Sequence, residues 1–229
     1  MTAPAPIRPL EGLKVVDFST LLPGPMASLI LAEAGAEVVK IERPGTGDEM
    51  RTYEPRVGET SANFALLNRA KRSVAIDLKS AQGREEAIEL ASRADILIEQ
   101  FRPGVMERLG LSYKTLSAGN PGLIYCSISG YGQTGPKAQV AAHDLNYAAE
   151  TGFLSLVRGA DGTPAMTATP IADLAGGAYP AVINILMALA ERARTGKGRH
   201  LDVAMAEKRR TRPDKKAPSA HPRLPFDPR

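Results

Sequence analysis

Short β-branched runs alternate with helix-like segments along most of this chain, and this alternation constrains the fold more than any other feature. Turn residues bound each run, and glycine or serine marks several helix ends. Strands that alternate with helices of this length form a mainly parallel sheet, which needs cover on both faces. The sequence therefore predicts an α/β fold: a Rossmann-like parallel sheet with helices on both faces. The predicted strands are 13–18, 37–42, 73–78, 95–99, 123–129 and 200–205, and the predicted helices are 26–34, 81–94, one from about 144, and 174–193.

A glycine-rich loop over residues 130–136 follows the predicted strand at 123–129. Ligands of parallel sheets bind at the carboxyl ends of the strands, so this loop is a candidate binding element. Two short helical segments precede the same strand. Farther along the chain, residues 159–164 predict a hairpin-like connection.

Charge divides the chain into two parts. The net charge of the 229 residues is +4, but residues 208–229 hold eight Lys or Arg and two Asp, which leaves the rest slightly acidic. This tail also has five prolines and little apolar periodicity, so we expect it to be disordered. We predict one large domain over residues 1–207 and a basic, proline-rich tail over 208–229. Because the excess of positive charge lies in the tail, we expect no nucleic-acid partner.

The cysteine content and the apolar stretches of the sequence indicate where in the cell the protein is expected. Cys126 is the only cysteine and lies in an apolar run, so a disulfide scaffold is excluded and a core position is predicted. The first six residues lack the features of a secretory signal, and glycines and a proline interrupt the apolar stretch at 174–190. We expect a cytoplasmic protein, a buried helix over that stretch and no membrane partner.

Several cofactor motifs are absent from the sequence. The first predicted strand–helix turn, residues 19–25, lacks the G-x-G-x-x-G spacing that binds a dinucleotide, and Gly196-Lys197 lacks the spacing of a P-loop. The histidines at 143, 200 and 221 form no convincing metal-ligand pattern. We expect neither a prosthetic group nor a metal.

His143 and Asp173 stand at two predicted helix starts. His143 precedes Asp144, a possible helix cap, and the N–H groups of a helix start would stabilise an oxygen anion beside the histidine. Asp173 could cap the second helix, where the glycine pair at 176–177 indicates close approach of a ligand or another segment. Pro180 should kink that helix. Residue type alone leaves a structural role open for both His143 and Asp173.

Several ordered blocks resemble the class III CoA-transferase superfamily over about residues 9–207. The resemblance implies a Rossmann-like large domain that binds coenzyme A, with an acyl-CoA thioester as substrate and no prosthetic group. It also implies a homodimer of longer, interlocked chains. The family pattern is lost after residues 204–207, so the large domain is incomplete relative to the family. The blocks that carry the resemblance are 9–42, 68–73, 102–110, 129–136, 143–147 and 194–198.

One of these blocks, His-Asp-Leu-Asn-Tyr at 143–147, is similar to the α-methylacyl-CoA racemase branch, and so is a further block, Ala-Asp-x-x-Gly-Gly at 172–177. This similarity implies that His143 and Asp173 flank the substrate α-carbon, where one removes a proton and the other returns one to the opposite face. It also implies that the backbone N–H of Asp144 donates to the thioester oxygen. We therefore predict a racemase or epimerase of 2-methylacyl-CoA.

Basic residues near predicted strand ends are candidates for contacts with the phosphates of CoA. The block at 68–72 packs three cations into four positions, which favours the 3′-phosphate or the pyrophosphate. A solvated charge run is the alternative. The predicted CoA-binding residues are Arg43, Asn68, Arg69, Lys71, Arg72, Arg102, Arg108 and Tyr147.

Two other functions remain open. In the transferase branch an aspartate attacks the thioester and forms a covalent anhydride. The resemblance puts Asp161 at that position, although Asp-Gly is also a common turn pair. Formyl-CoA transferases carry glutamine and glutamate where this chain has Leu22 and Gln133, which favours the racemase. The third possibility is an inactive fragment that only binds CoA, because a second domain completes the site in this superfamily.

Overall fold

A six-stranded parallel sheet forms the centre of the protein. The computed structural model describes residues 7–206, and the predicted tail over 208–229 lies outside them. The strand order is β5-β2-β1-β6-β7-β8, and every neighbouring pair is parallel. The sheet strands are β1 (Lys14–Asp17), β2 (Glu37–Glu42), β5 (Arg72–Ala75), β6 (Ile96–Glu99), β7 (Ile124–Ser129) and β8 (His200–Ala204).

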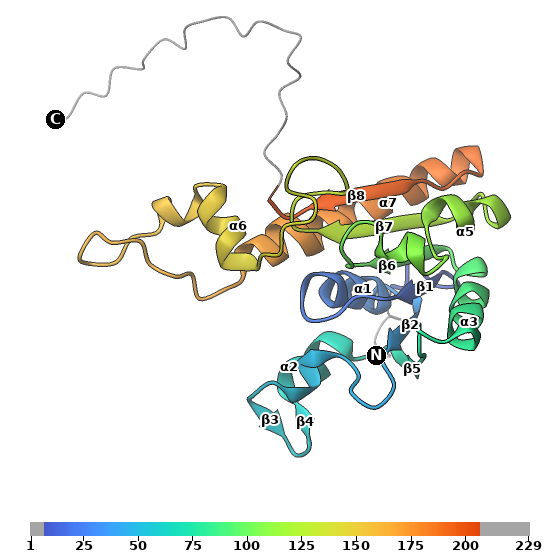
Figure 1. The fold of residues 1–229 in the computed structure, drawn as a ribbon, viewed down its shortest axis with the longest axis horizontal. Coiled ribbons are helices and arrows are strands. Elements are labelled where there is room, and N and C mark those ends of the chain that lie inside the picture. Colours follow the sequence, from blue (N-terminus) through green and yellow to red (C-terminus); the bar gives the residue numbers. More distant parts are fainter. Residues whose placement is uncertain (1–6, 207–229) are drawn as a thin grey trace, which may run out of the picture.

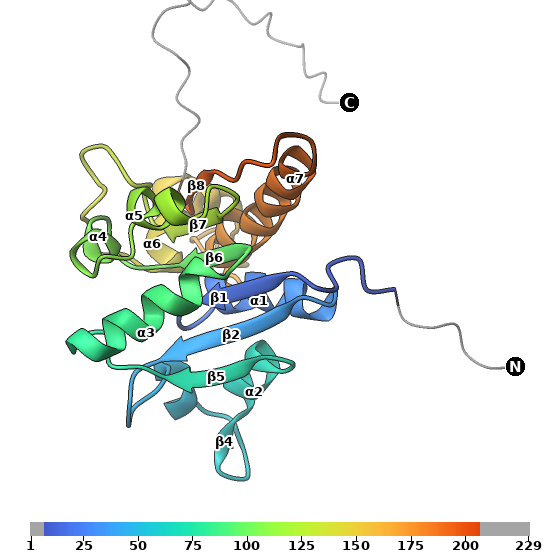
Figure 2. The same ribbon diagram turned by 90° about the vertical axis from the view of Figure 1, so that its right-hand side faces the viewer.

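Helices cover both faces of the sheet, which confirms the predicted fold class (Figures 1 and 2). One face packs on α1 (Pro23–Glu33) and α7 (Tyr179–Thr195), and its core includes Cys126, as predicted. The opposite face packs on α3 (Ala81–Ser92), α4 (Val105–Arg108) and α5 (Tyr113–Gly119). Ser80 caps α3 by accepting the Gly83 N–H at 2.9 Å, also as predicted.

The strand order reverses direction between β1 and β6. The chain first adds strands on one side of β1, up to the edge strand β5, and then returns to add β6, β7 and β8 on the other side. In such sheets the loops after the two central strands separate and leave a crevice at their carboxyl ends. A ligand site is therefore expected beyond Asp17 and Glu99, the last residues of β1 and β6.

The last crossover has the opposite hand to the four before it. The β1-to-β2 connection moves toward β5 over the face of α1, whereas the β7-to-β8 connection moves the other way over that same face. Nearly all parallel crossovers are right-handed, so this reversal is unusual. It brings α7 and the π-helical turn η3 (Ala172–Ala178) against α1.

A long excursion separates β7 from α7. It contains the glycine-rich loop, α6 (Asp144–Glu150), the short helix η2 (Phe153–Leu156) and a turn closed by the bridge between Arg158 and Pro164, which confirms the predicted hairpin-like connection. Figure 1 shows α6 and the following segment, yellow to orange, extending away from the sheet.

Three features differ from the prediction. A small antiparallel hairpin of β3 (Arg56–Val57) and β4 (Thr60–Ser61), with the short helices η1 (Glu49–Thr52) and α2 (Ala62–Asn68), lies between β2 and β5. The predicted long helix begins as η3, and Pro180 lies in the first turn of α7, where proline is accommodated.

The continuous helix Ala172–Thr195 is long and apolar enough to cross a membrane by length and composition. One side is a core helix face, as predicted, and includes the fully buried Ala178, Ala181 and Ile185. The other side leaves Ile183 and Met187 exposed.

Candidate functional site

His143 and Asp173 line one cavity at the carboxyl edge of the sheet. The cavity has a volume of about 250 Å³ and lies where β1, β6, β7 and β8 end. It therefore occupies the crevice expected from the reversal of strand order. Thirty residues separate the two side chains in sequence, and the excursion between β7 and α7 brings them together.

His143 is the residue immediately before α6, and its side chain is exposed. The Asn146 side chain accepts the His143 N–H at 3.0 Å, and the His143 carbonyl accepts the Asn146 N–H at 2.9 Å. This reciprocal pair fixes the backbone at the helix start. Asp144, the possible cap in the sequence analysis, is instead the first residue of α6. The cap position is occupied by His143, one residue earlier than expected.

Asp144 caps a different helix. Its Oδ1 atom accepts the backbone N–H of Asp173 at 2.9 Å. Asp173 itself makes no side-chain cap, because Ile171 precedes the helical turn and its side chain has no acceptor. The structure therefore excludes the capping role that the sequence left open for Asp173, and its carboxylate is left to face the cavity.

The half-buried carboxyl of Asp173 is a weaker acid than an ordinary aspartic acid. Burial raises its pKa and the negative charge of Asp144 raises it further, while His143 lowers it, which leaves a pKa of about 6. A group with such a pKa exchanges protons readily near neutral pH. The surroundings of Asp173 therefore suit acid–base chemistry.

The glycine pair after Asp173 permits close packing of another chain segment, as predicted. A Cβ atom on Gly176 would lie 2.4 Å from the Met205 carbonyl oxygen, and one on Gly177 would lie 3.0 Å from the Pro23 side chain. Both Met205 and Pro23 line the cavity. Larger residues here would push η3 away from the ends of β1 and β8.

Tyr147, one of the predicted binding residues, forms part of the cavity wall. Its hydroxyl donates to the Ala142 carbonyl at 2.7 Å, and its ring meets the Tyr131 ring edge to face at 5.3 Å. A Cβ on Gly130 would lie 2.4 Å from the Tyr147 hydroxyl, so glycine is needed at the start of the loop. The glycine-rich loop thus packs directly on α6.

A second, larger cavity lies at the carboxyl ends of β1, β2 and β5. Its volume is about 650 Å³, and its lining includes two cations, Arg43 and Lys79, and two acids, Glu42 and Asp77, of which Glu42 pairs with Arg51. Phe101, which follows β6, lines both this cavity and the one that contains His143. Arg43 is one of the predicted binding residues, and Lys79 is not among them, although its position soon after a predicted strand end was a usable signal.

The basic block at 68–72 does not line either cavity. Asn68 accepts from the Lys71 Nζ atom at 2.9 Å, and Arg69 pairs with Glu33. The Lys71 side chain is almost fully buried; its Nζ donates to the Pro25 carbonyl at 2.8 Å and lies 3.5 Å from an Asp17 oxygen. These contacts give the block a role in packing α1 and α2 onto the sheet.

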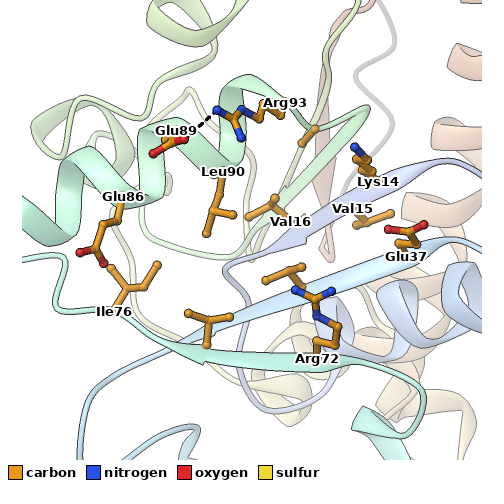
Figure 3. Close-up of a pocket in the computed structure, with 13 residues that line it drawn as sticks. Lys14, Val15, Val16, Glu37, Arg72, Ile76, Glu86, Glu89, Leu90 and Arg93 are labelled. Atoms are coloured by element: carbon orange, nitrogen blue, oxygen red, sulfur yellow. Dashed lines mark ion pairs between the residues drawn. The ribbon is translucent and has the colours of Figure 1, made fainter.

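Arg72 begins β5, at the end of the strands opposite the two cavities. It lines a separate cavity of about 460 Å³ with an apolar floor, next to Lys14 and Glu37 (Figure 3). Glu89 and Arg93 of α3 form an ion pair at its rim, with 2.8 Å between oxygen and nitrogen. The structure therefore separates Arg72 from the carboxyl edge of the sheet.

Of the three remaining predicted residues, one lines a cavity at the carboxyl edge of the sheet and two do not. Arg102 lines the cavity that holds His143, whereas Arg108 lies in α4 and lines neither cavity. Asp161 is exposed in the turn beyond α6, where its carboxylate accepts the Thr163 N–H at 3.0 Å and hydroxyl at 2.8 Å. These hydrogen bonds lower the pKa of Asp161. The structure does not bring Asp161 to the cavity.

A buried charge cluster that the sequence analysis missed supports the first strand–helix turn. Asp17 faces Lys71, and Lys40 lies 2.9 Å from Asp48, with all four side chains nearly inaccessible. Asp48 also accepts the N–H of Leu21 at 3.1 Å, which holds that residue in a left-handed conformation with φ of 62°. Charged residues inside the apolar runs of β1 and β2 were the signal for this cluster.

Glu99 is a second buried acid beside the site. Burial raises its pKa to about 7, although hydrogen bonds from the Ser127 hydroxyl and the Phe101 N–H lower it. The Phe101 N–H lies 2.9 Å from the Glu99 carboxylate. Glu99 therefore anchors the loop that separates the two cavities. Within residues 7–206, no group of three or more His, Cys, Asp or Glu side chains is placed to hold a metal ion.

Comparison with known proteins assigns the chain to a family. The model of CoA-transferase family III matches residues 10–211. Acetyl-CoA:oxalate CoA-transferase of Acetobacter aceti is 45% identical over 206 residues, which are 89% of this chain and 53% of that protein. The α-methylacyl-CoA racemase of Homo sapiens is 40% identical over 198 residues, which are 86% of this chain and 48% of that protein.

Solved structures agree with this assignment. A CAIB/BAIF family protein from Brucella suis superposes with a TM-score of 0.83 at 40% identity, over 88% of this chain and 54% of that one. The chain thus spans about half the length of the relatives it matches. Its sheet, its helices and its sequence all place the chain in CoA-transferase family III.

Proposed function

We propose that this chain carries an acyl-CoA site for proton transfer at the α-carbon, as a racemase or epimerase of 2-methylacyl-CoA thioesters. The observation that carries the proposal is the presence of His143 and Asp173 in one cavity at the switch point of the sheet. Racemases of this kind need two proton-transfer groups near one carbon atom. The racemase of Homo sapiens is among the relatives at about 40% identity.

The reaction needs no net gain or loss of protons. One of the two groups, His143 or Asp173, takes the α-proton and leaves an enolate thioester, and the other gives its proton to the opposite face of the carbon. The pair ends with one proton moved between them, and reverse turnover restores it. The Asp144 N–H, in the first turn of α6, is the donor proposed for the enolate oxygen, because such groups have no acceptor within the helix.

The larger cavity is the proposed site for the nucleotide part of CoA. Arg43 and Lys79 supply positive charge for its phosphates, and the cavity opens at strand ends, where phosphorylated ligands commonly bind. Phe101 borders both cavities, so a ligand that runs past it would carry its thioester toward His143. Arg102, in the smaller cavity, is then a candidate contact near the thioester end.

Isotope exchange tests the proposal directly. The chain is incubated with (2R)-2-methylacyl-CoA in D₂O, and mass spectrometry follows deuterium at the α-carbon. We expect incorporation by the wild type and a loss of at least about 100-fold in His143→Ala and Asp173→Asn, since a general acid or base contributes about that much. His200→Gln is the matched control, because His200 lies outside the cavity of His143. Absence of exchange in folded protein that binds the acyl-CoA would rule out the racemase.

A CoA-transferase is the second candidate. The Acetobacter aceti relative is named as a transferase, and the Asp173 carboxylate lies in the cavity where a thioester carbonyl would be attacked. In this reaction the carboxylate oxygen bonds to the acyl carbon and the CoA thiolate leaves, which gives an acyl anhydride. Asp161, exposed and bound to Thr163, is the weaker candidate for that nucleophile.

Hydroxylamine separates the two candidate reactions. Acyl-CoA and hydroxylamine are added together, and peptide mapping locates any hydroxamate. An adduct at Asp173 or Asp161 supports the transferase and names its nucleophile, whereas deuterium exchange without an adduct supports the racemase. Binding of acyl-CoA with neither product would support the third possibility, a chain that binds CoA without turning it over.

A further inference from the structure

The Asp144 carboxylate links the two candidate proton-transfer groups. Asp144 directly follows His143, so its backbone is continuous with that residue at the start of α6. Its side chain reaches across to η3 and accepts the Asp173 N–H at 2.9 Å. One residue therefore contacts both sides of the proposed reaction centre, through the main chain on one side and through the carboxylate on the other.

The covalent path between the two groups offers little rigidity. The segment between α6 and η3 contains one isolated bridge, between Arg158 and Pro164, and its side chains are mostly exposed. Its hydrogen bonds are local, such as Gly159 N–H to the Thr163 carbonyl at 2.9 Å and Thr167 hydroxyl to the Thr169 carbonyl at 2.7 Å. A direct contact between α6 and η3 is therefore a more effective constraint than the connection itself.

Asp144 also acts on Asp173 through its charge. Its carboxylate raises the pKa of Asp173, second to burial, and His143 acts in the opposite direction. The other ionisable groups that line the cavity with Asp173 are Tyr147 of α6 and Arg102 of the loop after β6. Asp144 is the source of added negative charge that is also bound to the Asp173 backbone.

We propose that Asp144 is a positioning residue for α-proton transfer, whose carboxylate holds the Asp173 backbone at a fixed distance from His143. This inference rests on the function proposed above. The constraint matters because a displacement of about 1 Å at a reacting group can slow a reaction about 100-fold. The side chain thus has a task separate from that of the Asp144 backbone N–H.

Two substitutions separate the hydrogen bond from the charge. Asp144→Asn keeps a side-chain oxygen that can accept the Asp173 N–H but removes the charge, whereas Asp144→Ala removes both. We expect the exchange rate of the asparagine variant at its optimal pH to stay within about threefold of wild type. In its pH–rate profile, the limb that reports ionisation of Asp173 should move to lower pH. We expect the alanine variant to lose about 100-fold in kcat with a small change in KM. Glu85→Gln, an exposed change of the same charge on α3, should alter neither.

The contrast between the variants decides the matter. If Asp144 only kept the chain folded, its replacement would lower the fraction of folded protein, and kcat per folded chain would be unchanged in the alanine variant. Equal rates for the alanine and asparagine variants, or an alanine variant within twofold of wild type, would overturn the proposal.

A measurement without substrate distinguishes failure of this inference from failure of the proposed function. In ¹⁵N spectra of the uncomplexed chain, the Asp173 amide resonance should move upfield in Asp144→Ala and much less in Asp144→Asn, and ¹³C detection should show a lower Asp173 pKa in both. If these shifts occur but the wild type shows no deuterium exchange, the racemase is rejected and the positioning role of Asp144 stands. If the Asp173 amide resonance does not move in Asp144→Ala, the positioning role is rejected whatever the activity.

Discussion

Replacing Asp173 with asparagine should make the protein more stable at pH 8 and have much less effect at pH 4. The pKa of Asp173 rises from 3.8 to about 6 on folding, first because of burial and then because of the charge of Asp144. The folded protein therefore binds the Asp173 proton more tightly than the unfolded chain does. Ionised Asp173 then costs stability, and the cost grows as the pH rises from 3.8 through 6.

The size of the effect follows from the same pKa values. Each pKa unit corresponds to about 1.4 kcal/mol, so ionised Asp173 lowers the free energy of unfolding by at most about 3 kcal/mol well above pH 6. At pH 4 most of this cost is absent, because Asp173 is protonated in the folded state and about half protonated in the unfolded one. The asparagine amide can also change stability by an amount that does not depend on pH. Subtracting the effect of Asp173→Asn at pH 4 from its effect at pH 8 removes that contribution.

Urea unfolding of the wild type and Asp173→Asn at both pH values measures this difference. Asp161→Asn is the matched control: that carboxylate is exposed and hydrogen bonds to Thr163 lower its pKa, so its removal should not add stability at pH 8. If the gain of Asp173→Asn were the same at pH 4 and pH 8, the raised pKa would be refuted. A cost of this kind is expected where function and stability compete, as they would if Asp173 has the proton-transfer role proposed above.

Three further predictions concern residues around the two cavities. Lys71→Ala should lower the free energy of unfolding by about 1 to 3 kcal/mol, because it removes one of the two lysines whose charge offsets buried Asp17, and urea unfolding would show no such loss if Lys71 instead bound CoA. Gly176→Ala should cost about 1 to 3 kcal/mol by the same method, since the new Cβ would meet a carbonyl oxygen at 2.4 Å; full stability would mean that η3 shifts freely. Arg43→Ala should weaken CoA binding about 10-fold in calorimetry, whereas Arg69→Ala should not, and equal losses would contradict the assignment of the larger cavity.

Most strands and helices could be predicted because their signals are local. The strand predicted at 37–42 matches β2 residue for residue. Ser80 caps α3 through a hydrogen bond to a residue only three positions away in the sequence. The strand order and the reversed hand of the last crossover could not be predicted from such patterns, because they depend on which distant surfaces pack together. The hairpin of β3 and β4 was missed since each strand has only two residues.

The same contrast between local signals and long-range packing applies to the candidate site. His143 and Asp173 were identified through the family resemblance, and the structure brings both to one cavity, while their chemical roles stay predictions. Lys71 was predicted to bind phosphate because a lysine in a basic run looks the same whether it is solvated, bound to a ligand or buried. Its partner, Asp17, is 54 residues away, and only the fold reveals their pairing.

The reversed crossover also affects the order in which this protein folds. The contact between Ser127 of β7 and His200 of β8 joins residues 73 positions apart, so β8 docks only after a long loop has closed. Loop-closure entropy makes such contacts slow to form, whereas β1, α1 and β2 can associate locally. The η3 turn packs against Met205, immediately after β8, so the wall of the cavity that carries Asp173 is completed with this final strand. The part of the smaller cavity that Asp173 lines therefore depends on the pairing of β7 with β8, which joins residues much farther apart in the sequence than the pairing of β1 with β2 does.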